Sequence, residues 1–217
     1  MIRQILTLPD SMIQRRIDRR GLRLEAILIL ICGLLGGIGT AYVAVQAMGA
    51  LSGENSQLQF TFIGQVLSPL VFLFLVWIGY TLVSHILASQ FHGRGPISRL
   101  LRTSAWSLVP IGIWYLIRSI VTVYLFFSVE FQTNPEGLNA DEEFQNIMNL
   151  GFDGSLLYIV TLFVGVLFVV WSWSLLADAI EKAKTVSSDD ARKIAAVPAA
   201  VYGLYVLWTA LQSTGIV

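Results

Sequence analysis

The sequence contains few charged residues and one cysteine. Charged residues make up 13% of its 217 residues, hydrophobic residues make up 55%, and the mean hydropathy is +0.70. Soluble domains of this length have about twice that fraction of charged residues, so the composition excludes a soluble globular domain. The single cysteine, Cys32, excludes an intrachain disulfide. The basic residues are too few and lie too close to apolar runs for a nucleic-acid-binding protein.

Recognisable catalytic and cofactor motifs are also absent from the sequence. It has no P-loop, dinucleotide fingerprint, nucleophile elbow or zinc-ligand spacing. Two histidines, His85 and His92, can be grouped with Asp178 and Glu181 near one membrane face, but without any HExxH pattern. That grouping favours ordinary interfacial polar residues over a metal site. We therefore expect no enzyme activity, no cofactor and no metal.

What the sequence does contain is a series of five long apolar runs. Each run is long enough to cross the ~30 Å hydrocarbon core of a bilayer as a helix. The pattern predicts an all-α, polytopic integral membrane bundle of five transmembrane helices within a single domain, 25–213. The predicted spans are 26–51, 60–88, 103–127, 156–180 and 194–211.

Two segments outside these spans have charges of one sign. Residues 1–24 form a basic arm with six arginines, which predicts an amphipathic cytoplasmic helix lying on an anionic leaflet. The alternative is a solvated arm whose charges only set topology. Residues 129–154 form an outer loop whose charged residues are all acidic, and they predict a short helix on the outer surface.

The distribution of Lys and Arg predicts the orientation of the chain. The N-terminal arm holds six, the second loop three and the fourth loop four, whereas the first loop, the third loop and the tail hold none. Because cytoplasmic loops carry an excess of Lys and Arg, the N-terminus is predicted inside and the C-terminus outside. We expect a multi-pass protein of the cell membrane.

The chain is organised around a basic turn, 91–110, between the second and third spans. With the turn after the fourth span, it predicts a cytoplasmic basic surface for anionic lipid headgroups or a protein partner. The alternative is that these charges only determine topology. The residues of this surface are Arg94, Arg99, Arg102, Lys182 and Lys184.

The first span contains small residues at four-residue spacing, Gly33, Gly37 and Ala41. Small residues at this spacing allow two helix backbones to approach closely. The spacing predicts packing against another span of the same chain or against a second copy, which would make a homo-oligomer.

One arginine, Arg118, lies inside the third span, close to its middle. Pro69 in the second span leaves the carbonyl of Gln65 without its helical donor. We expect Arg118 to donate to this broken turn and to line, with Tyr115, a polar cavity for an anionic or lipid group. The alternative is an arginine that extends outward to the acidic third loop.

Two stretches resemble a known family. Phe91-His-Gly-Arg-Gly-Pro-Ile-Ser, followed by Ala105-Trp-Ser-Leu-Val-Pro110, is similar to a glycine-rich turn before a span that begins with a small residue, an aromatic and proline. Trp171-Ser-Trp-Ser-Leu-Leu and Ala191-Arg-Lys-Ile-Ala-Ala-Val-Pro198 resemble a final helix pair joined by a short basic turn. Both resemble the Yip-one domain family, the Ypt/Rab-interacting membrane proteins.

That resemblance implies a membrane-embedded bundle without known catalytic residues. Eukaryotic members are associated with vesicle traffic and Rab-type GTPases. The short cytoplasmic arm of this chain is more similar to prokaryotic members, for which the family implies no defined activity. The sequence therefore predicts a non-enzymatic membrane organiser or adaptor that acts through helix packing and basic cytoplasmic turns on lipids or a membrane-protein partner. The alternative is a small channel or transporter, with Arg118 and the proline-broken helices along a polar path.

Overall fold

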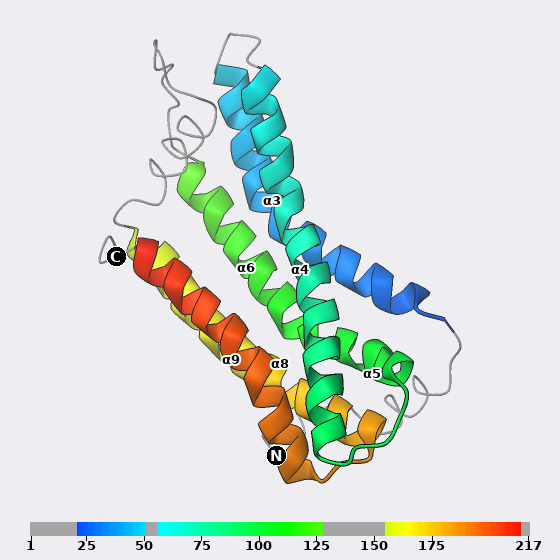
Figure 1. The fold of residues 1–217 in the computed structure, drawn as a ribbon. Coiled ribbons are helices and arrows are strands. Elements are labelled where there is room, and N and C mark those ends of the chain that lie inside the picture. The colour runs from blue at the N-terminus through cyan, green and yellow to red at the C-terminus, as the bar shows by residue number, and fades with distance from the viewer. Residues whose placement is uncertain (1–20, 51–55, 128–154, 214–217) are drawn as a thin grey trace.

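The chain is described from a computed structural model, which covers residues 21–50, 56–127 and 155–213. All regular secondary structure in these ranges is helical, and five helical segments are long and apolar enough to cross a membrane, as predicted. The elements are α3 (Arg23–Ala50), α4 (Ser56–Gln90), α5 (Ile97–Ser104), the 3₁₀ helix η1 (Ala105–Leu108), α6 (Val109–Phe126), α8 (Leu156–Lys184) and α9 (Ser188–Ser213) (Figure 1). The predicted basic arm and acidic loop lie outside the described residues, apart from 21–24.

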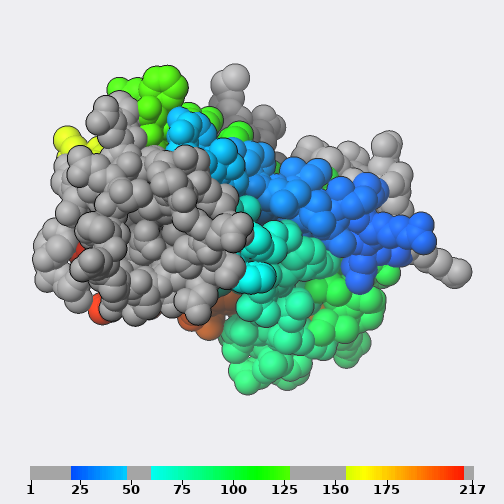
Figure 2. All heavy atoms as spheres, turned by 90° about the horizontal axis from the view of Figure 1, so that it is seen from above, coloured from blue at the N-terminus to red at the C-terminus, as the bar shows by residue number. Residues whose placement is uncertain are grey.

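The helices form two antiparallel pairs with α6 between them. The first pair, α3 and α4, runs side by side along one flank (Figure 2), and the second pair, α8 and α9, forms a hairpin (Figure 1). Since the chain reverses at each turn, the end of α4, all of α5, the end of α8 and the start of α9 lie at one end of the bundle (Figure 1). The end of α6, the start of α8 and the end of α9 lie towards the opposite end.

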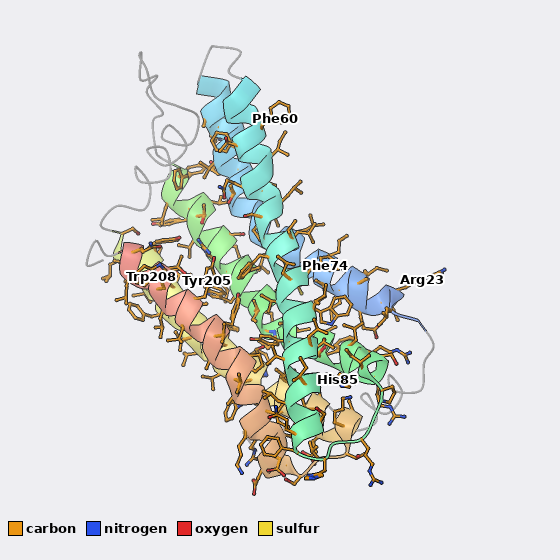
Figure 3. All side chains as sticks on the ribbon, in the orientation of Figure 1. Arg23, Phe60, Phe74, His85, Tyr205 and Trp208 are labelled. Carbon is orange, nitrogen blue, oxygen red and sulfur yellow. The ribbon has the colours of Figure 1, made fainter. Side chains whose placement is uncertain are left out.

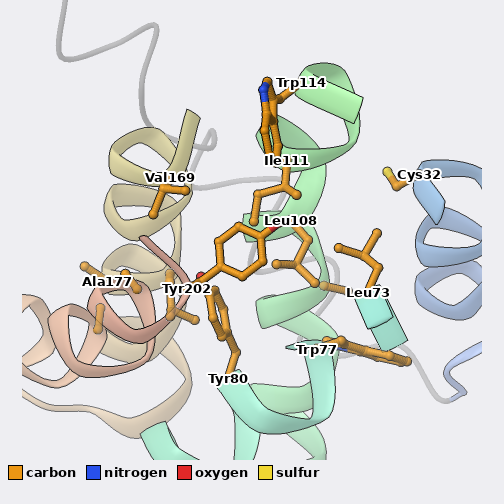
Figure 4. Packing of buried hydrophobic residues seen from close by; sticks show 14 of the residues in the cluster. Cys32, Leu73, Trp77, Tyr80, Leu108, Ile111, Trp114, Val169, Ala177 and Tyr202 are labelled. Carbon is orange, nitrogen blue, oxygen red and sulfur yellow. The ribbon is translucent and has the colours of Figure 1, made fainter. Parts of the chain in front are cut away.

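The core of the bundle is apolar, and much of its outer surface is apolar as well. Leu108, Ile111 and Leu176 are fully buried in a cluster that also contains the aromatic rings of Tyr80 and Tyr202 (Figure 4). Large apolar side chains on every long helix are nevertheless exposed, for example Leu167 and Leu204. A helix that is apolar all round suits a lipid environment, so these side chains face hydrocarbon.

The third span does not begin as one continuous helix. It starts after Pro96, but α5 ends at Ser104 and the 3₁₀ helix η1 separates it from α6. Pro110 accounts for this break, because it has no N–H for the carbonyl of Trp106 and its ring would clash with that carbonyl in an α-helix. Pro110 therefore lies in the first turn of α6, the position that tolerates proline.

The small residues of α3 pack against helices of the same chain. A Cβ atom on Gly33 would lie 2.5 Å from the Cα of Leu70, and one on Gly37 would lie 2.3 Å from the carbonyl oxygen of Val66. Both contacts are with α4, so these glycines bring the two backbones together. Ala41, the third residue of this series, is half-buried.

Side-chain hydrogen bonds to backbone carbonyls connect the helices. Trp114 on α6 donates its indole N–H to the carbonyl of Thr161 on α8, at 3.0 Å. Ser119 on α6 donates to the carbonyl of Leu35 on α3, at 2.6 Å. In hydrocarbon an unpaired polar group costs several kcal/mol. A rotation of either helix about its axis would break these bonds, so they fix the rotation of each helix.

Candidate functional site: two docked basic turns

The turn between α4 and α5 is built by a specific helix ending. The N–H of Gly93 donates to the carbonyl of Ala88 at 2.8 Å, and the N–H of His92 donates to that of Ser89 at 3.3 Å. This pair of bonds is a Schellman motif, in which the residue at the position of His92 adopts a left-handed conformation. His92 has φ 58°, and Gly95 follows with φ 144°. The chain therefore reverses direction within a few residues.

The turn between α8 and α9 is equally short. Thr185, with φ 52°, ends α8 in the left-handed conformation. The hydroxyl oxygen of Ser187 accepts from the N–H of Asp190 at 3.2 Å, and the same hydroxyl donates to the Asp190 carboxylate at 2.6 Å. Ser187 thus caps α9, and the acidic residues in its first turn are favourable at the positive end of the helix dipole.

These two turns are docked on each other through their backbones. The N–H of Arg94 donates to the carbonyl of Lys184 at 2.8 Å, and the hydroxyl of Thr185 donates to the carbonyl of Arg94 at 3.2 Å. A Cβ atom at Gly95 would lie 2.3 Å from the carbonyl oxygen of Ala183. Only glycine fits at that position, both for its φ angle and for this close approach.

The side chain of Lys184 lies inside this junction. It is 1% exposed, and its ammonium group donates to the carbonyl of Gly95 and is hydrogen-bonded to Nδ1 of His85 on α4. The prediction that Lys184 belongs to an exposed basic surface is therefore wrong. The reason is its helical position: Leu176 and Ile180 are fully buried, and Lys184 continues the same stripe at four-residue spacing.

The other predicted basic residues surround the junction. Arg94 is exposed, whereas Arg99, Arg102 and Lys182 are half-buried. Within the described residues, neither Arg94 nor Arg99 forms an ion pair. The structure thus brings the two predicted basic turns together at one end of the bundle.

Two further cations lie close by on α9 and have acidic neighbours. Arg192 lies 3.9 Å from the carboxylate of Asp189, and Lys193 lies 3.6 Å from that of Asp190. These side chains are largely exposed, so each pair contributes little to stability. Among the cations of the two turns and the start of α9, Arg94 and Arg99 are therefore the ones that the described residues leave without an acidic or other partner.

The two histidines lie in different environments and do not form a common site. His85 lies on α4 beside the α5 end of the bundle (Figure 3) and contacts Lys184, whereas His92 is exposed in the turn. Across the residues that the structure describes, no group of three or more His, Cys, Asp and Glu side chains is arranged to hold a metal ion.

Arg118 lies away from the docked turns and has a different partner from the predicted one. Its guanidinium donates to the hydroxyl of Tyr158 on α8 at 2.8 Å and lies 5.7 Å from the centre of the Tyr158 ring. The predicted donation to the carbonyl of Gln65 is wrong, since within the described residues Arg118 donates to Tyr158 alone, and that carbonyl accepts from the hydroxyl of Ser68 at 3.0 Å. Ser68 supplies the hydrogen bond that Pro69 cannot, so the broken turn is satisfied within α4.

Tyr115 and Pro69, two other residues predicted at this site, meet at Gly36. A Cβ atom on Gly36 would lie 2.7 Å from the Tyr115 ring and 2.8 Å from Pro69. Tyr115 is buried, and its hydroxyl accepts a hydrogen bond from Tyr202 on α9 at 3.4 Å. Gln65 is exposed on α4, so it does not share this buried position.

Three partners were not predicted from the sequence: Tyr158 for Arg118, Tyr202 for Tyr115, and His85 for Lys184. The burial of Lys184 could have been predicted, because Lys184 follows the apolar residues Leu176 and Ile180 at four-residue spacing on one face of the helix. No local pattern marks Tyr158, which lies 40 residues from Arg118 and meets it only through tertiary packing.

The helices and the docked turns together define a polytopic integral membrane protein. The family model of the Yip1 domain matches residues 3–211, and the chain belongs to that family, as its sequence predicts. This is generally a family of non-enzymatic membrane proteins. Comparison with curated proteins and with solved structures found no match.

Proposed function

We propose that this protein is a non-enzymatic membrane organiser or adaptor whose docked turns present Arg94 and Arg99 to an acidic partner at the cytoplasmic face of the cell membrane. The observation that carries this proposal is the junction itself, in which Lys184 and Gly95 hold two distant turns together. A fixed backbone gives the arginines a defined spacing. Preorganised groups bind more tightly because less conformational entropy is lost on association.

Two kinds of acidic surface suit this end of the bundle. Each Lys or Arg near an anionic leaflet contributes about 1 kcal/mol, so lipid headgroups hold the turns at the membrane surface. Arginine also binds carboxylates in a bidentate geometry, which favours an acidic segment of a membrane-protein partner. In the proposed orientation, with the N-terminus inside, the docked turns face the cytoplasm, so the anionic leaflet or the acidic partner would be cytoplasmic.

Self-association through the glycines of α3 is not required by this proposal. Gly33 and Gly37 lie against α4 of the same chain, and a Cβ atom at either glycine would meet that helix. A second copy would therefore have to bind elsewhere, and the partner that we propose is a different polypeptide.

Site-specific photocrosslinking tests the proposed surface. A photoreactive residue at His92, which is exposed in the α4–α5 turn, is compared with one at Phe127, which is exposed at the opposite end of α6. We expect His92 to capture a defined polypeptide that Phe127 does not, and reversal of Arg94 and Arg99 to glutamate to abolish that capture. Equal capture from both positions, or capture insensitive to the reversal, would contradict the proposal.

One observation favours the alternative function, a small channel or transporter. The hydroxyl groups of Tyr80 and Ser84 on α4 and of Ser172 on α8 are buried, and within the described residues the one interacting pair among them is Tyr80 and Ser172, whose hydroxyls interact without ideal hydrogen-bond geometry. Buried hydroxyls of this kind are usually satisfied by bound water. Ion and solute flux into liposomes tests this alternative: flux that Tyr80→Phe lowers would support it, and absence of flux would reject it.

A further inference from the structure

Within the described residues, Arg118 has more hydrogen-bond donors than acceptors to receive them. A guanidinium has five N–H donors, and within the described residues Arg118 makes one hydrogen bond, to the neutral hydroxyl of Tyr158. No carboxylate in the same part of the chain forms an ion pair with it. A positive charge at membrane depth is costly, so it is retained where an anion or polar groups compensate it.

Two further tyrosines, Tyr115 on α6 and Tyr205 on α9, lie within electrostatic range of Arg118 without contacting it. Among the described residues neither hydroxyl has an acceptor for its own proton, since Tyr115 accepts from Tyr202 and Tyr205 makes no hydrogen bond through its hydroxyl. Arg118 therefore has unused N–H groups, and two hydroxyls with unused protons lie in the same region of the bundle.

The position of this cluster along the helices places it near a membrane boundary. Arg118 is the tenth residue of α6, an 18-residue helix, but its partner Tyr158 is only the third residue of α8. The first turn of a spanning helix lies close to the boundary between hydrocarbon and headgroups, and the guanidinium contacts a residue of that turn in α8. The guanidinium is therefore at a depth that a headgroup phosphate can reach.

On the side of α9, the cluster includes an exposed aromatic residue, whereas Tyr115 and Tyr158 are buried. Tyr205 is 49% exposed, and it lies with Trp208 on the outer face of α9 towards the end where that helix finishes (Figure 3). Its ring packs against Phe72 of α4, with 4.9 Å between ring centres. Acyl chains suit the exposed aromatic surface, whereas the guanidinium and phenol groups suit an oxyanion.

We propose that Arg118, Tyr115, Tyr158 and Tyr205 form a binding site for the phosphate group of a phospholipid. The guanidinium supplies the charge, the phenol hydroxyls supply additional donors, and Tyr158 positions the guanidinium. This site lies on α6, α8 and α9 and shares no residue with the docked turns, so it does not depend on the proposed adaptor function.

Native mass spectrometry of the full chain in detergent tests this site. Phosphatidic acid and diacylglycerol with the same acyl chains are added in parallel, so that the two ligands differ only in the phosphate. We expect the wild type to prefer phosphatidic acid, and Arg118→Gln to reduce that preference about tenfold or more, as loss of a charge-assisted hydrogen bond implies. An unchanged preference in Arg118→Gln would overturn the proposal.

Two additional variants keep this test informative. Tyr205→Phe removes one exposed hydroxyl without disturbing the core, and we expect it to reduce the preference a few-fold even if Arg118→Gln fails to fold. The paired substitution Arg94→Gln with Arg99→Gln removes two charges at the other end, and we expect one phosphatidic acid molecule to remain bound. Loss of that molecule in the paired variant, or no effect of Tyr205→Phe, would contradict the assignment.

A competition experiment separates a lipid from a free anion. Inorganic phosphate is added at the concentration of phosphatidic acid, and the lipid that remains bound is measured. We expect no displacement, because the acyl chains add apolar contacts with the helices. Displacement of the lipid by inorganic phosphate at equal concentration would show that the site takes a free oxyanion, and the lipid assignment would be wrong.

Discussion

The ammonium group of Lys184 donates to the carbonyl of Gly95, which lies 89 residues earlier in the chain. This bond joins the end of α8 to the turn that follows α4, and the N–H of Arg94 returns a second bond to the carbonyl of Lys184. The antiparallel pairs of helices are thus connected at one end by their turns as well as by side-chain packing. Changes in either turn should therefore affect the stability of the whole bundle.

Gly95→Ala should destabilise the protein. The substitution forces an L side chain into φ 144° and places its Cβ atom 2.3 Å from the carbonyl oxygen of Ala183. Strain of this kind costs about 1–3 kcal/mol, so we expect a fall of several degrees in the thermal unfolding temperature in detergent. Gly79→Ala is the control, because a Cβ atom there meets nothing within 4 Å and α-helices favour alanine. Equal stability of the two variants would contradict this account of the junction.

Lys184→Ala should also destabilise the bundle, by about 1–3 kcal/mol, since it leaves the buried carbonyl of Gly95 without its donor and creates a cavity. Lys193→Ala is the matched control, since Lys193 is exposed and its ion pair with Asp190 is worth about 0–1 kcal/mol. Thermal unfolding followed by circular dichroism distinguishes the two variants. If Lys184→Ala unfolds at the temperature of the Lys193→Ala variant, Lys184 does not stabilise the junction.

Gly37→Ala should separate α3 from α4. A Cβ atom at this position would lie 2.3 Å from the carbonyl oxygen of Val66, so the backbones must move apart and lose packing. Overpacking of this kind costs about 1–3 kcal/mol. Gly64→Ala on α4 is the control, because nothing lies within 4 Å of a Cβ atom there. A variant that remains as stable as this control but changes its oligomeric mass would instead assign Gly37 to an interface between copies.

Trp114→Phe should lower stability more than Trp208→Phe. The first substitution removes the donor for the carbonyl of Thr161 and shortens a ring that packs against Gly165, where α6 meets α8. Loss of a buried hydrogen bond costs about 1–3 kcal/mol. Trp208 is 51% exposed on α9, so its replacement by another aromatic residue should change the unfolding temperature little. The opposite ranking of the two unfolding temperatures would contradict the assigned packing of α6 on α8.

The sequence predicted the membrane bundle because hydrocarbon imposes a length and a composition on every span. It also predicted that Arg94, Arg99 and Lys182 lie in one basic region, because turns on the same side of a membrane must lie at the same end of the helices. The burial of Lys184 was not predicted, since loop composition alone cannot distinguish a snorkelling lysine from one inside a junction. The partner of Arg118 was not predicted either, because the rotation of α6 relative to α8 depends on contacts such as that between Trp114 and Gly165.

The break between α5 and α6 shows that the sequence indicated a helix broken by proline but did not predict the geometry of the break. Pro110 was recognised inside the third span, but its effect depends on whether neighbouring groups can satisfy the freed carbonyls. Here the hydroxyl of Ser107 donates to the carbonyl of Ser104 at 2.7 Å, and the hydroxyls of Thr81 and Ser104 share a hydrogen bond of 2.8 Å. The carbonyl of Trp106 accepts from the N–H of Val109 instead, and together these bonds fix a short 3₁₀ segment.

Charge reversal in native membranes tests the proposed adaptor surface most directly. Arg94→Glu with Arg99→Glu is compared with Arg192→Glu and Lys193→Glu, which changes the net charge equally but alters cations that already have acidic neighbours. After chemical crosslinking and mass spectrometry, the account predicts that the wild type and the α9 variant capture the same polypeptide and that the Arg94 and Arg99 variant does not. Capture that survives in both variants, or that disappears equally in both, would contradict a specific role for the docked turns.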